Sequence, residues 1–208
     1  AKILAPFGDG LELNLSCPHA KGYGMDMGQD PELVKEIICA VKAAVDIPVI
    51  PKLTPNVPNL KEIAIASVEG GADAICAINT TGPNCYEAHD HPILSNEKGG
   101  VSGKGILPTA LRIVKEISAS VSCPIIGCGG ISSAANVREF QEAGASIIGI
   151  GSALVGMNTK EIAFYFQELS KDLENNTKNA EPLVRYDIDM RFEPVTLVNK
   201  EKITDDIC

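Results

Sequence analysis

The stretch Leu11-Glu12-Leu13-Asn14-Leu15-Ser16-Cys17-Pro18-His19 reads as a buried strand that runs directly into a polar loop. Pro18 ends the strand, because proline has no N–H for the ladder and a fixed φ. An amide, a hydroxyl, a thiol and an imidazole occur together between Asn14 and His19. A thiol at a strand end lies where α/β enzymes carry their catalytic groups. The stretch therefore predicts an α/β fold with chemistry at the end of this strand.

Outward from this stretch, short apolar segments of the same kind recur along the chain. Strands are predicted at residues 10–16, 48–53, 72–79, 124–128 and 146–150. Each is apolar on both faces and is followed by Gly, Thr or Asn. That pattern is typical of parallel strands covered by helices.

Segments with helical periodicity separate these strands. Helices are predicted at residues 31–45, 59–69, 108–121, 132–144 and 160–173. Asp30 is suited to the N-cap position ahead of Pro31. The near-repeats at residues 69–73 and 142–146 each place glycine at a helix C-cap just before a strand. The chain is therefore predicted to consist of repeated βα units.

Repeated βα units with tight glycine caps predict either a (β/α) barrel or a doubly wound sheet. Five strands do not close a barrel, which needs eight. A barrel assignment therefore implies that its N-terminal strands are truncated or reside on another chain. Residues 1–177 are predicted to form the barrel portion, and residues 178–208 a charged C-terminal tail with an edge strand at 192–198. Residues 80–107 are predicted to be a long polar loop with a functional role.

Composition argues against several classes of function. The chain has 208 residues, 45% of them hydrophobic, which suffices for one globular domain with a core. A net charge of −9 without a Lys/Arg cluster argues against nucleic acid as a partner. The apolar stretches are far shorter than a membrane helix, and no signal peptide is visible. We therefore expect a cytoplasmic protein that binds neither nucleic acid nor membranes.

The seven cysteines are an odd number, and no two of them have C-x-x-C spacing. A disulfide framework and a zinc or other metal site are therefore not expected. We expect the protein to lie in a reducing compartment. Cys39 and several others are predicted to be small core hydrophobes. Cys17 differs from them, because its polar neighbours favour a general acid/base or a nucleophile over a structural thiol.

Polar side chains also end other predicted strands. Asn14 and Asn79 lie at the same end of a parallel sheet, where two amides can read the N–H and C=O edge of a planar amide ring. Capping of the loops is the alternative for either residue alone, and the adjacent Thr80 and Thr81 favour a site. Lys52 ends a strand in which a charge is costly unless it has an anionic partner. A ligand contact by Lys52 is therefore predicted.

Two glycine-rich segments each lie between a predicted strand and a predicted helix. They are Gly127-Cys128-Gly129-Gly130-Ile131 and Gly149-Ile150-Gly151-Ser152-Ala153. Glycines let backbone N–H groups approach a phosphate, and barrels commonly bind phosphate after their last two strands. The pair therefore predicts a phosphate site, with tight packing of helix on strand as the alternative. Gly99-Gly100-Val101-Ser102-Gly103 is a weaker version of the same signal.

Taken together, these elements resemble the flavin-dependent dihydroorotate dehydrogenases of class 1 and the related flavin domain of dihydropyrimidine dehydrogenase. The resemblance covers roughly residues 8–175 in order and spacing. It is carried by Leu13-Asn14-Leu15-Ser16-Cys17-Pro18, Gly28-Gln29-Asp30-Pro31-Glu32-Leu33-Val34, Lys52-Leu53-Thr54-Pro55-Asn56-Val57, Ile78-Asn79-Thr80, Gly99-Gly100-Val101-Ser102-Gly103, Gly127-Cys128-Gly129-Gly130-Ile131 and Gly151-Ser152-Ala153.

The resemblance implies an FMN-binding (β/α)8 TIM-type barrel, of which about five C-terminal βα units lie in this chain. It implies an oxidoreductase of pyrimidine metabolism that interconverts a 5,6-dihydropyrimidine and its pyrimidine. Cys17 would take a proton from C5 of the ring while a hydride passes from C6 to flavin N5. Asn14, Ser16, Asn79 and Thr80 would hold the ring. Because the family's first strands are absent, the chain alone is not expected to form a complete FMN site.

The resemblance also assigns residues to the cofactor. Lys52 would lie near the N1/O2 edge of the flavin and stabilise its anionic reduced form. Ser102 and Gly103 would touch the cofactor. The phosphate would be held by Gly129, Gly130, Gly151 and Ser152. This division follows the general rule that the cofactor carries the redox step while the protein orients and tunes it.

The resemblance divides over the substrate. His19 would contact the ring, and histidine at this position is similar to the dihydropyrimidine dehydrogenases, as is Gly28-Gln29. Pro92-Ile93-Leu94-Ser95-Asn96 resembles the dihydroorotate enzymes that work with an iron–sulfur partner subunit. The interpretation from the site residue favours dihydrouracil slightly, with dihydroorotate as the alternative. The electron acceptor is left open.

Partners follow from the same resemblance. A homo-oligomer and an electron-transfer partner subunit are expected, with an iron–sulfur cluster on that partner or on an adjoining domain. Residues 195–202 resemble the lead-in to a ferredoxin-like domain, but the cysteine run of a cluster does not follow in this chain.

Two further hypotheses compete with this reading. Another phosphate-binding barrel enzyme, such as a sugar-phosphate isomerase or synthase, would explain the glycine loops but not Ser16-Cys17-Pro18 or Lys52. A non-catalytic half-barrel that pairs with another chain would explain the missing strands. A colourless protein would favour the first of these.

Overall fold

The computed structural model describes residues 1–16, 27–85, 87–88, 91–92, 94–95 and 97–175. Cys17 and His19 lie outside the described residues, and so does the predicted tail at 178–208 with its edge strand. The predicted boundary near residue 177 therefore stays a prediction.

The centre of the fold is a five-stranded parallel sheet with the order β1-β2-β3-β8-β9. Its strands are β1 (Leu11–Asn14), β2 (Val49–Leu53), β3 (Ile75–Ala77), β8 (Ile125–Cys128) and β9 (Ile147–Gly149). Each of the five predicted strands is thus confirmed. Their order in the sheet follows their order in the chain, so every crossover leads to a neighbouring strand.

A helix follows each strand. The helices are α1 (Pro31–Lys42), α2 (Leu60–Glu69), α3 (Leu107–Ser118), α4 (Ala134–Glu142) and α5 (Thr159–Glu174). The predicted cap of α1 is confirmed, because the Asp30 carboxylate accepts the backbone N–H groups of Glu32 and Leu33 at 3.0 and 3.3 Å. Among the described residues, no helix combines the length and apolar character needed to cross a bilayer.

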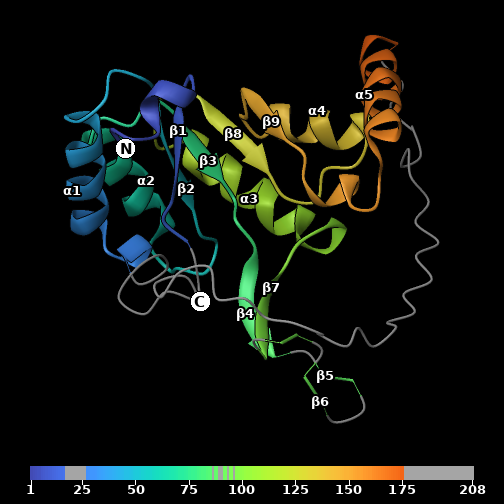
Figure 1. Ribbon diagram of the computed structural model, residues 1–208, viewed down its shortest axis with the longest axis horizontal. Coiled ribbons are helices and arrows are strands. Elements are labelled where there is room, and N and C mark those ends of the chain that lie inside the picture. Colours follow the sequence, from blue (N-terminus) through green and yellow to red (C-terminus); the bar gives the residue numbers. More distant parts are fainter. Residues whose placement is uncertain (17–26, 86, 89–90, 93, 96, 176–208) are drawn as a thin grey trace.

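The arrangement of the helices distinguishes the two predicted fold classes. Each helix packs against the next one in the chain, from α1 through α5 (Figure 1). A doubly wound sheet reverses its strand order at a switch point and places helices on both faces. Sequential parallel strands with sequentially packed helices are instead the wall of a (β/α) barrel. The fold is therefore barrel-type, with five βα units in the part of the chain that the structure describes.

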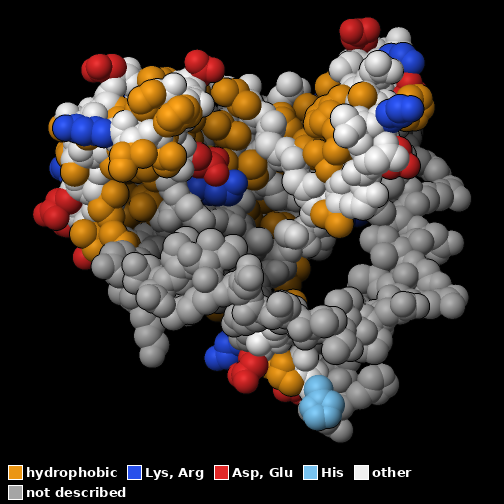
Figure 2. All heavy atoms as spheres, in the orientation of Figure 1, with side chains coloured by type: hydrophobic (Ala, Val, Ile, Leu, Met, Phe, Trp, Pro, Cys, Tyr) orange, Lys and Arg blue, Asp and Glu red, His pale blue; other side chains and the backbone are white. Residues whose placement is uncertain are grey.

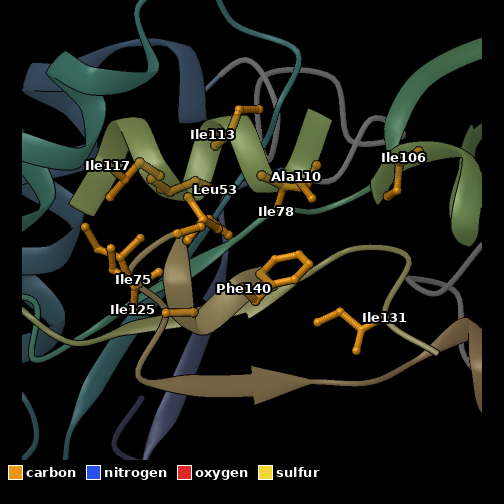
Figure 3. Packing of buried hydrophobic residues seen from close by; sticks show 14 of the residues in the cluster. Leu53, Ile75, Ile78, Ile106, Ala110, Ile113, Ile117, Ile125, Ile131 and Phe140 are labelled. Atoms are coloured by element: carbon orange, nitrogen blue, oxygen red, sulfur yellow. The ribbon is translucent and has the colours of Figure 1, made fainter. Parts of the chain in front are cut away.

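The hydrophobic core lies between the sheet and this layer of helices (Figure 3). Ile75 and Ile125 face it from the sheet, and Ile113 and Phe140 from α3 and α4; all are at most 2% exposed. Gly127 lies in β8 beneath the Phe140 ring, and a Cβ at this position would collide with that ring. One of the predicted phosphate-loop glycines thus serves close packing of helix on strand.

The segment at residues 80–107 is more ordered than a loop. Antiparallel strands β4 (Thr81–Cys85) and β7 (Lys98–Val101) form an arm that projects from the sheet (Figure 1). The short strands β5 (Glu87–Ala88) and β6 (His91–Pro92) pair beyond it, and the 3-10 helix η3 (Lys104–Ile106) leads into α3. The sequence did not predict this hairpin, because its residues are polar and rich in glycine. The two strands pair through close approach of their backbones rather than through apolar side chains. At Gly100 a Cβ would collide with the Thr80 side chain.

Apolar side chains reach the surface beside both edge strands of the described sheet (Figure 2). Ile3, Leu4 and Phe7 lie around the 3-10 helix η1 (Ala5–Phe7), which immediately precedes β1. Ile147 is 52% exposed in β9, and Phe164 is 63% exposed in α5. A closed barrel has no sheet edges, so such surfaces are what an open barrel wall presents.

The remaining 3-10 helices are η2 (Met27–Gln29) and η4 (Ser152–Leu154).

A capping box begins α5 and gives a testable stability effect. The Asn158 side chain accepts the N–H groups of Lys160 and Glu161 at 2.9 and 3.2 Å, and the Glu161 carboxylate accepts the Asn158 N–H at 2.7 Å. We expect Asn158→Ala to lower the free energy of unfolding by about 1 kcal/mol. Asn59→Ala is the control, because Asn59 is the N-cap of α2 without a side-chain capping bond. Equal urea midpoints for the two variants would contradict the assignment.

Candidate functional site

A cavity of about 370 Å³ opens at the carboxyl ends of β3, β8 and β9, where barrel enzymes place their active sites. Its volume is in the range of small-molecule sites. Nine of the residues predicted from the sequence line it. They are Lys52, Asn79, Thr80, Ser102, Gly103, Gly129, Gly130, Gly151 and Ser152. The cavity therefore brings together residues from five separate segments of the chain.

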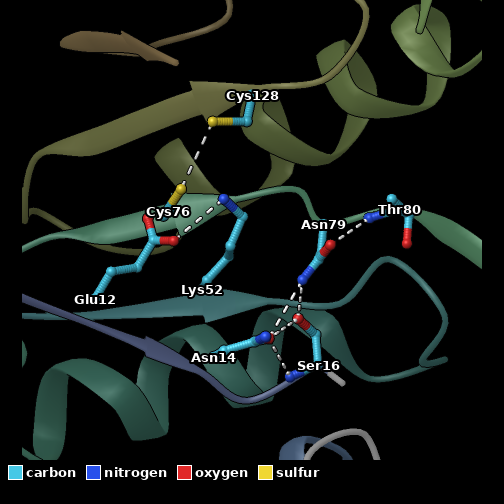
Figure 4. A network of polar contacts seen from close by, with 8 residues as sticks. All are labelled: Glu12, Asn14, Ser16, Lys52, Cys76, Asn79, Thr80 and Cys128. Atoms are coloured by element: carbon cyan, nitrogen blue, oxygen red, sulfur yellow. Dashed lines mark hydrogen bonds and ion pairs between the residues drawn. The ribbon is translucent and has the colours of Figure 1, made fainter. Parts of the chain in front are cut away.

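Asn14, Ser16 and Asn79 form one hydrogen-bond network at the ends of β1 and β3 (Figure 4). The Ser16 hydroxyl donates to Asn14 Oδ1 at 2.9 Å. The Asn79 Nδ2 group donates to Asn14 Oδ1 at 3.4 Å and also to the Ser16 hydroxyl. The two amides predicted to share a site are thus in contact, across 65 positions of sequence. Side-chain amides held in this way present fixed donors and acceptors.

The side-chain oxygen of Asn79, Oδ1, accepts the Thr80 backbone N–H at 2.8 Å, and this bond sets the orientation of the Asn79 side-chain amide. Asn56 supports the next residues, because its Nδ2 group donates to the Thr80 carbonyl at 3.1 Å and its Oδ1 accepts the Gly82 N–H at 2.9 Å. Asn56 in turn donates to the Thr54 hydroxyl at 3.0 Å. The loop after β2 therefore positions the chain that leaves β3. Thr81 begins the projecting strand β4 and does not line the cavity.

The three glycine segments predicted to contact a cofactor converge on the same cavity. Gly103, Gly129 and Gly130 have φ values of +86°, +130° and +76°, a region that side chains rarely adopt. A Cβ at Gly130 would lie 2.7 Å from the Gly103 carbonyl, so the two loops touch through their backbones. At Gly151, by contrast, a Cβ would meet nothing within 4 Å. Open space beside that backbone leaves room for a ligand group.

Lys52 has the anionic partner that its burial requires. Its Nζ lies 3.2 Å from the Glu12 carboxylate, on the adjacent strand β1 (Figure 4). Burial lowers the pKa of Lys52, but electrostatic interactions with Cys76, Cys128 and Glu12 and the hydrogen bond to Glu12 together outweigh it, so the net pKa is raised. The side chain is 24% exposed and lines the cavity. Lys52 therefore supplies a permanent positive charge to the cavity at neutral pH.

Two cysteines lie beside this ion pair. Cys76 Sγ and Cys128 Sγ are 3.7 Å apart on neighbouring strands, and both line the cavity. A hydrogen bond from the Cys76 thiol lowers the pKa of Cys128 to about 7, against the effect of burial, and Lys52 contributes in the same direction. The same hydrogen bond, followed by burial, raises the pKa of Cys76. Cys128 is therefore the thiol of the pair that ionises near neutral pH.

Sequence reasoning missed Glu12, Cys76 and Cys128. A usable signal existed for Glu12, because it alternates with Leu11 and Leu13 and so lies on the same strand face as Asn14. The cysteine prediction was also wrong in detail. Cys39 is exposed on α1 rather than buried, while Cys76 is buried in β3. The apolar neighbours of Cys39 suggested burial, but position 39 faces about 100° away from the buried Ile38 on the helix.

The lowered pKa of Cys128 gives a prediction for its reactivity. Since the thiolate is the nucleophile, alkylation of Cys128 by iodoacetamide should rise with a midpoint near pH 7. In the urea-unfolded protein the midpoint should move up toward the ordinary value of about 8.5. Mass spectrometry of tryptic peptide 116–138 in a Cys123→Ser background measures the rate. Coincident profiles in the folded and unfolded protein would contradict the assignment.

The comparisons with known proteins agree with this geometry. A family model described as dihydroorotate dehydrogenase matches residues 1–175. The chain is 50% identical over 155 residues to a protein of Pyrococcus horikoshii named dihydroorotate dehydrogenase B (NAD(+)), catalytic subunit; the match covers 74% of this chain and 51% of the relative. A protein of the same name from Thermococcus kodakarensis is 45% identical over 175 residues, with 84% and 57% covered. The chain spans about half the length of the relatives it matches.

A solved structure shows the same fold at lower sequence identity. It is titled as the crystal structure of DHODH in complex with ferulenol from Eimeria tenella, and it matches with a TM-score of 0.68 at 20% identity. The match covers 84% of this chain and 52% of that one. Five parallel βα units, a cavity at the strand ends and a family match over residues 1–175 lead to one conclusion: the chain belongs to the dihydroorotate dehydrogenase family.

Proposed function

We propose that the protein is an FMN-dependent dihydroorotate dehydrogenase, which oxidises the C5–C6 bond of dihydroorotate to give orotate. The observation that carries this proposal is the network of Asn14, Ser16 and Asn79, which reaches the glycine-lined cavity through Asn79 and lies beside Lys52, the register partner of Asn14. The names of the relatives favour dihydroorotate over the dihydrouracil that His19 favoured.

The residues that line the cavity fit FMN on the part of the binding site that this chain forms. Gly151 has open space where a side chain would be, and Ser152 and the loop at Gly129–Gly130 line the same cavity. Backbone N–H groups and a hydroxyl are suited to a phosphate. Lys52 supplies a positive charge that can stabilise a flavin ring when the ring gains negative charge on reduction. We therefore assign the phosphate to Gly129, Gly130, Gly151 and Ser152, and the ring to Lys52, Ser102 and Gly103.

The substrate ring is assigned to the amide network. Asn79 Oδ1 accepts one bond within the network and keeps a second lone pair, and Asn14 carries an NH2 group; these complement the N–H and C=O groups of a dihydropyrimidine. Ser16 and Thr80 add a hydroxyl each. Because these groups already bond to one another, they hold fixed positions before a ligand binds, and this limits the ordering cost of binding.

The proton at C5 is assigned to Cys17, the residue that directly follows Ser16. A thiol can act as general base at neutral pH when its pKa is modestly lowered. FMN, when bound, supplies the acceptor for the hydride from C6. The protein's part is to bind the ring, to orient C5 toward Cys17 and to stabilise developing negative charge through Lys52.

The electrons are proposed to leave through a partner subunit. The relatives are named as the catalytic subunit of an NAD(+)-dependent enzyme, and that name presumes a further subunit. Within the described ranges no group of three or more His, Cys, Asp or Glu could hold a metal. Any iron–sulfur cluster is proposed to lie on a partner subunit or on an adjoining domain. Self-association of the chain stays a prediction.

Anaerobic bleaching of the flavin in the purified protein tests the substrate. Dihydroorotate and dihydrouracil are added separately, and the visible absorbance of the oxidised flavin is followed. Bleaching by dihydroorotate alone is the expected result. Bleaching by dihydrouracil alone would replace the proposed substrate with the one that His19 favoured. A colourless protein that takes up no FMN would favour another phosphate-binding barrel enzyme.

Asn79 gives a sharper test of the ring site. Asn79→Ala removes the amide that bonds both Asn14 and Ser16. We expect the KM for the substrate that bleaches the flavin to rise about tenfold or more. A change of this size is expected when one hydrogen bond that orients a ligand is lost. Asn59→Ala, at the start of α2, is the matched control and should leave KM unchanged. An unchanged KM in Asn79→Ala would move the ring away from this network.

A further inference from the structure

The proposed reaction does not use the two cysteines on the floor of the cavity. Cys76 comes from β3 and Cys128 from β8, and their side chains lie on the face that carries Lys52 and Glu12 (Figure 4). The two sulfurs are 3.7 Å apart, although 52 positions separate them in the chain. Two thiols this close together in a cavity open to ligands can take part in thiol–disulfide exchange.

The backbone on the next strand makes room for this pair. Gly149 is paired with Cys128 in the sheet, and a Cβ at this position would collide with the Cys128 sulfur. The Gly149 N–H also hydrogen-bonds to the Cys128 side chain and helps to lower its pKa. The glycine therefore both admits the sulfur and stabilises its thiolate, and phosphate binding explains neither effect.

The two thiols differ in access and charge. Cys128 is partly exposed toward the cavity, whereas Cys76 is 1% exposed. Lys52 favours the thiolate on both sulfurs, and Glu12 opposes it. The hydrogen bond between the sulfurs lowers the pKa of Cys128 and raises the pKa of Cys76. The pair thus contains a nucleophilic thiol in contact with a buried second thiol, which is the arrangement of an attacking and a resolving cysteine.

We propose that Cys76 and Cys128 form a redox-active dithiol on the cavity floor, which a small disulfide oxidises to an intramolecular disulfide. Cys128 is the attacking thiol and Cys76 is the resolving thiol. In the oxidised form Lys52 loses its thiolate neighbour, so the charge at the base of the cavity depends on the state of these two sulfurs. This inference does not rest on the proposed reaction, although the two cysteines line the same cavity that is assigned to FMN above.

The exchange is balanced in atoms and electrons. The Cys128 thiolate attacks one sulfur of the small disulfide, whose S–S bond breaks, and the first thiolate leaves and takes up a proton. Loss of the Cys128 charge removes the main cause that holds the Cys76 proton. Cys76 then releases that proton and attacks the Cys128 sulfur, and the second thiolate leaves and is protonated. The two cysteines lose two electrons, and the small disulfide is reduced to two thiols.

Closure of the pair combines side-chain rotation with a shift of the backbone, because Cys128 lies two positions beyond Ile126, the register partner of Cys76. A disulfide brings the sulfurs to about 2 Å, so the pair has to close from 3.7 Å. Rotation about χ1 moves a cysteine sulfur over a distance of this order. The cavity beside Cys128 provides the space for the departing thiol.

Peptide mapping tests the proposal in the purified protein. Trypsin places Cys76 with Cys85 in peptide 62–98, and Cys128 with Cys123 in peptide 116–138. A Cys85→Ser/Cys123→Ser background leaves one cysteine in each peptide and keeps both pocket thiols. The native protein is incubated with 2-hydroxyethyl disulfide, its remaining thiols are alkylated, and the digest is analysed without reduction. We expect peptides 62–98 and 116–138 to be recovered as one linked species, which a reductant separates.

Single variants in the same background establish the order of attack. With Cys76→Ser, Cys128 should accumulate the hydroxyethyl mixed disulfide, because no thiol resolves it. With Cys128→Ser, Cys76 should stay unmodified, because it is buried. Recovery of both peptides unlinked and alkylated would overturn the proposal. So would a link from peptide 116–138 to peptide 3–21, which holds Cys17, or a mixed disulfide at Cys76 in the Cys128→Ser variant.

Discussion

Cys17→Ala is expected to slow substrate-driven reduction of the flavin by about 10²–10⁴-fold, the usual contribution of a positioned acid or base. The substitution removes the proposed acceptor of the C5 proton. The amide network should stay intact, because the bonds that hold it run between the side chains of Asn14, Ser16 and Asn79. Stopped-flow bleaching under anaerobic conditions measures the rate, and fluorescence quenching measures the affinity for FMN.

The pH profile separates a catalytic from a structural role for Cys17. A base gives the wild-type rate an alkaline rise that Cys17→Ala should lack, whereas a packing defect would lower the rate at every pH. Cys39→Ala is the matched control, since Cys39 is a free, exposed thiol on α1. An unchanged rate in Cys17→Ala, or the same loss in the Cys39 variant, would remove Cys17 as the base.

Lys52→Met is expected to lower the reduction rate by about 10²–10³-fold, comparable with the loss of one group that stabilises developing negative charge. Methionine keeps much of the side-chain volume and removes the charge. The ion pair with Glu12 at 3.2 Å would be lost as well, which leaves a negative carboxylate beside the two cysteines. Both changes disfavour a reduced cofactor that carries negative charge. The midpoint potential of the bound flavin should therefore fall.

Lys42→Met is a close control for Lys52→Met. Lys42 also contacts one carboxylate, that of Asp73 at 2.8 Å, and its side chain is 30% exposed, against 24% for Lys52. It lies outside the cavity. The control should therefore retain the wild-type rate and potential. Equal potentials in wild type and Lys52→Met would show that Lys52 stabilises the protein rather than the reduced cofactor.

Much of the fold could be predicted because its signals are local. The strands were found from short apolar runs, the helices from their period, and the start of α1 from Asp30 and Pro31. The hairpin of β4 and β7 could not be found in this way. Its strands contain glycine and proline and lack alternating apolar residues, and their pairing is set by close backbone approach at Gly100. The choice between a barrel and a doubly wound sheet also required the order of the strands.

The same distinction holds for the site. The sequence by itself predicted most of the segments that line the cavity, because amides, glycines and a lysine at strand ends are local features. Only the tertiary structure decided that Asn79 bonds Asn14, that Lys52 pairs with Glu12 across 40 positions, and that Cys76 touches Cys128 across 52. The physical reason is that parallel strands bring distant residues into register through crossovers of many residues. Which side chains then share a face depends on that register, and no single segment of the chain contains it.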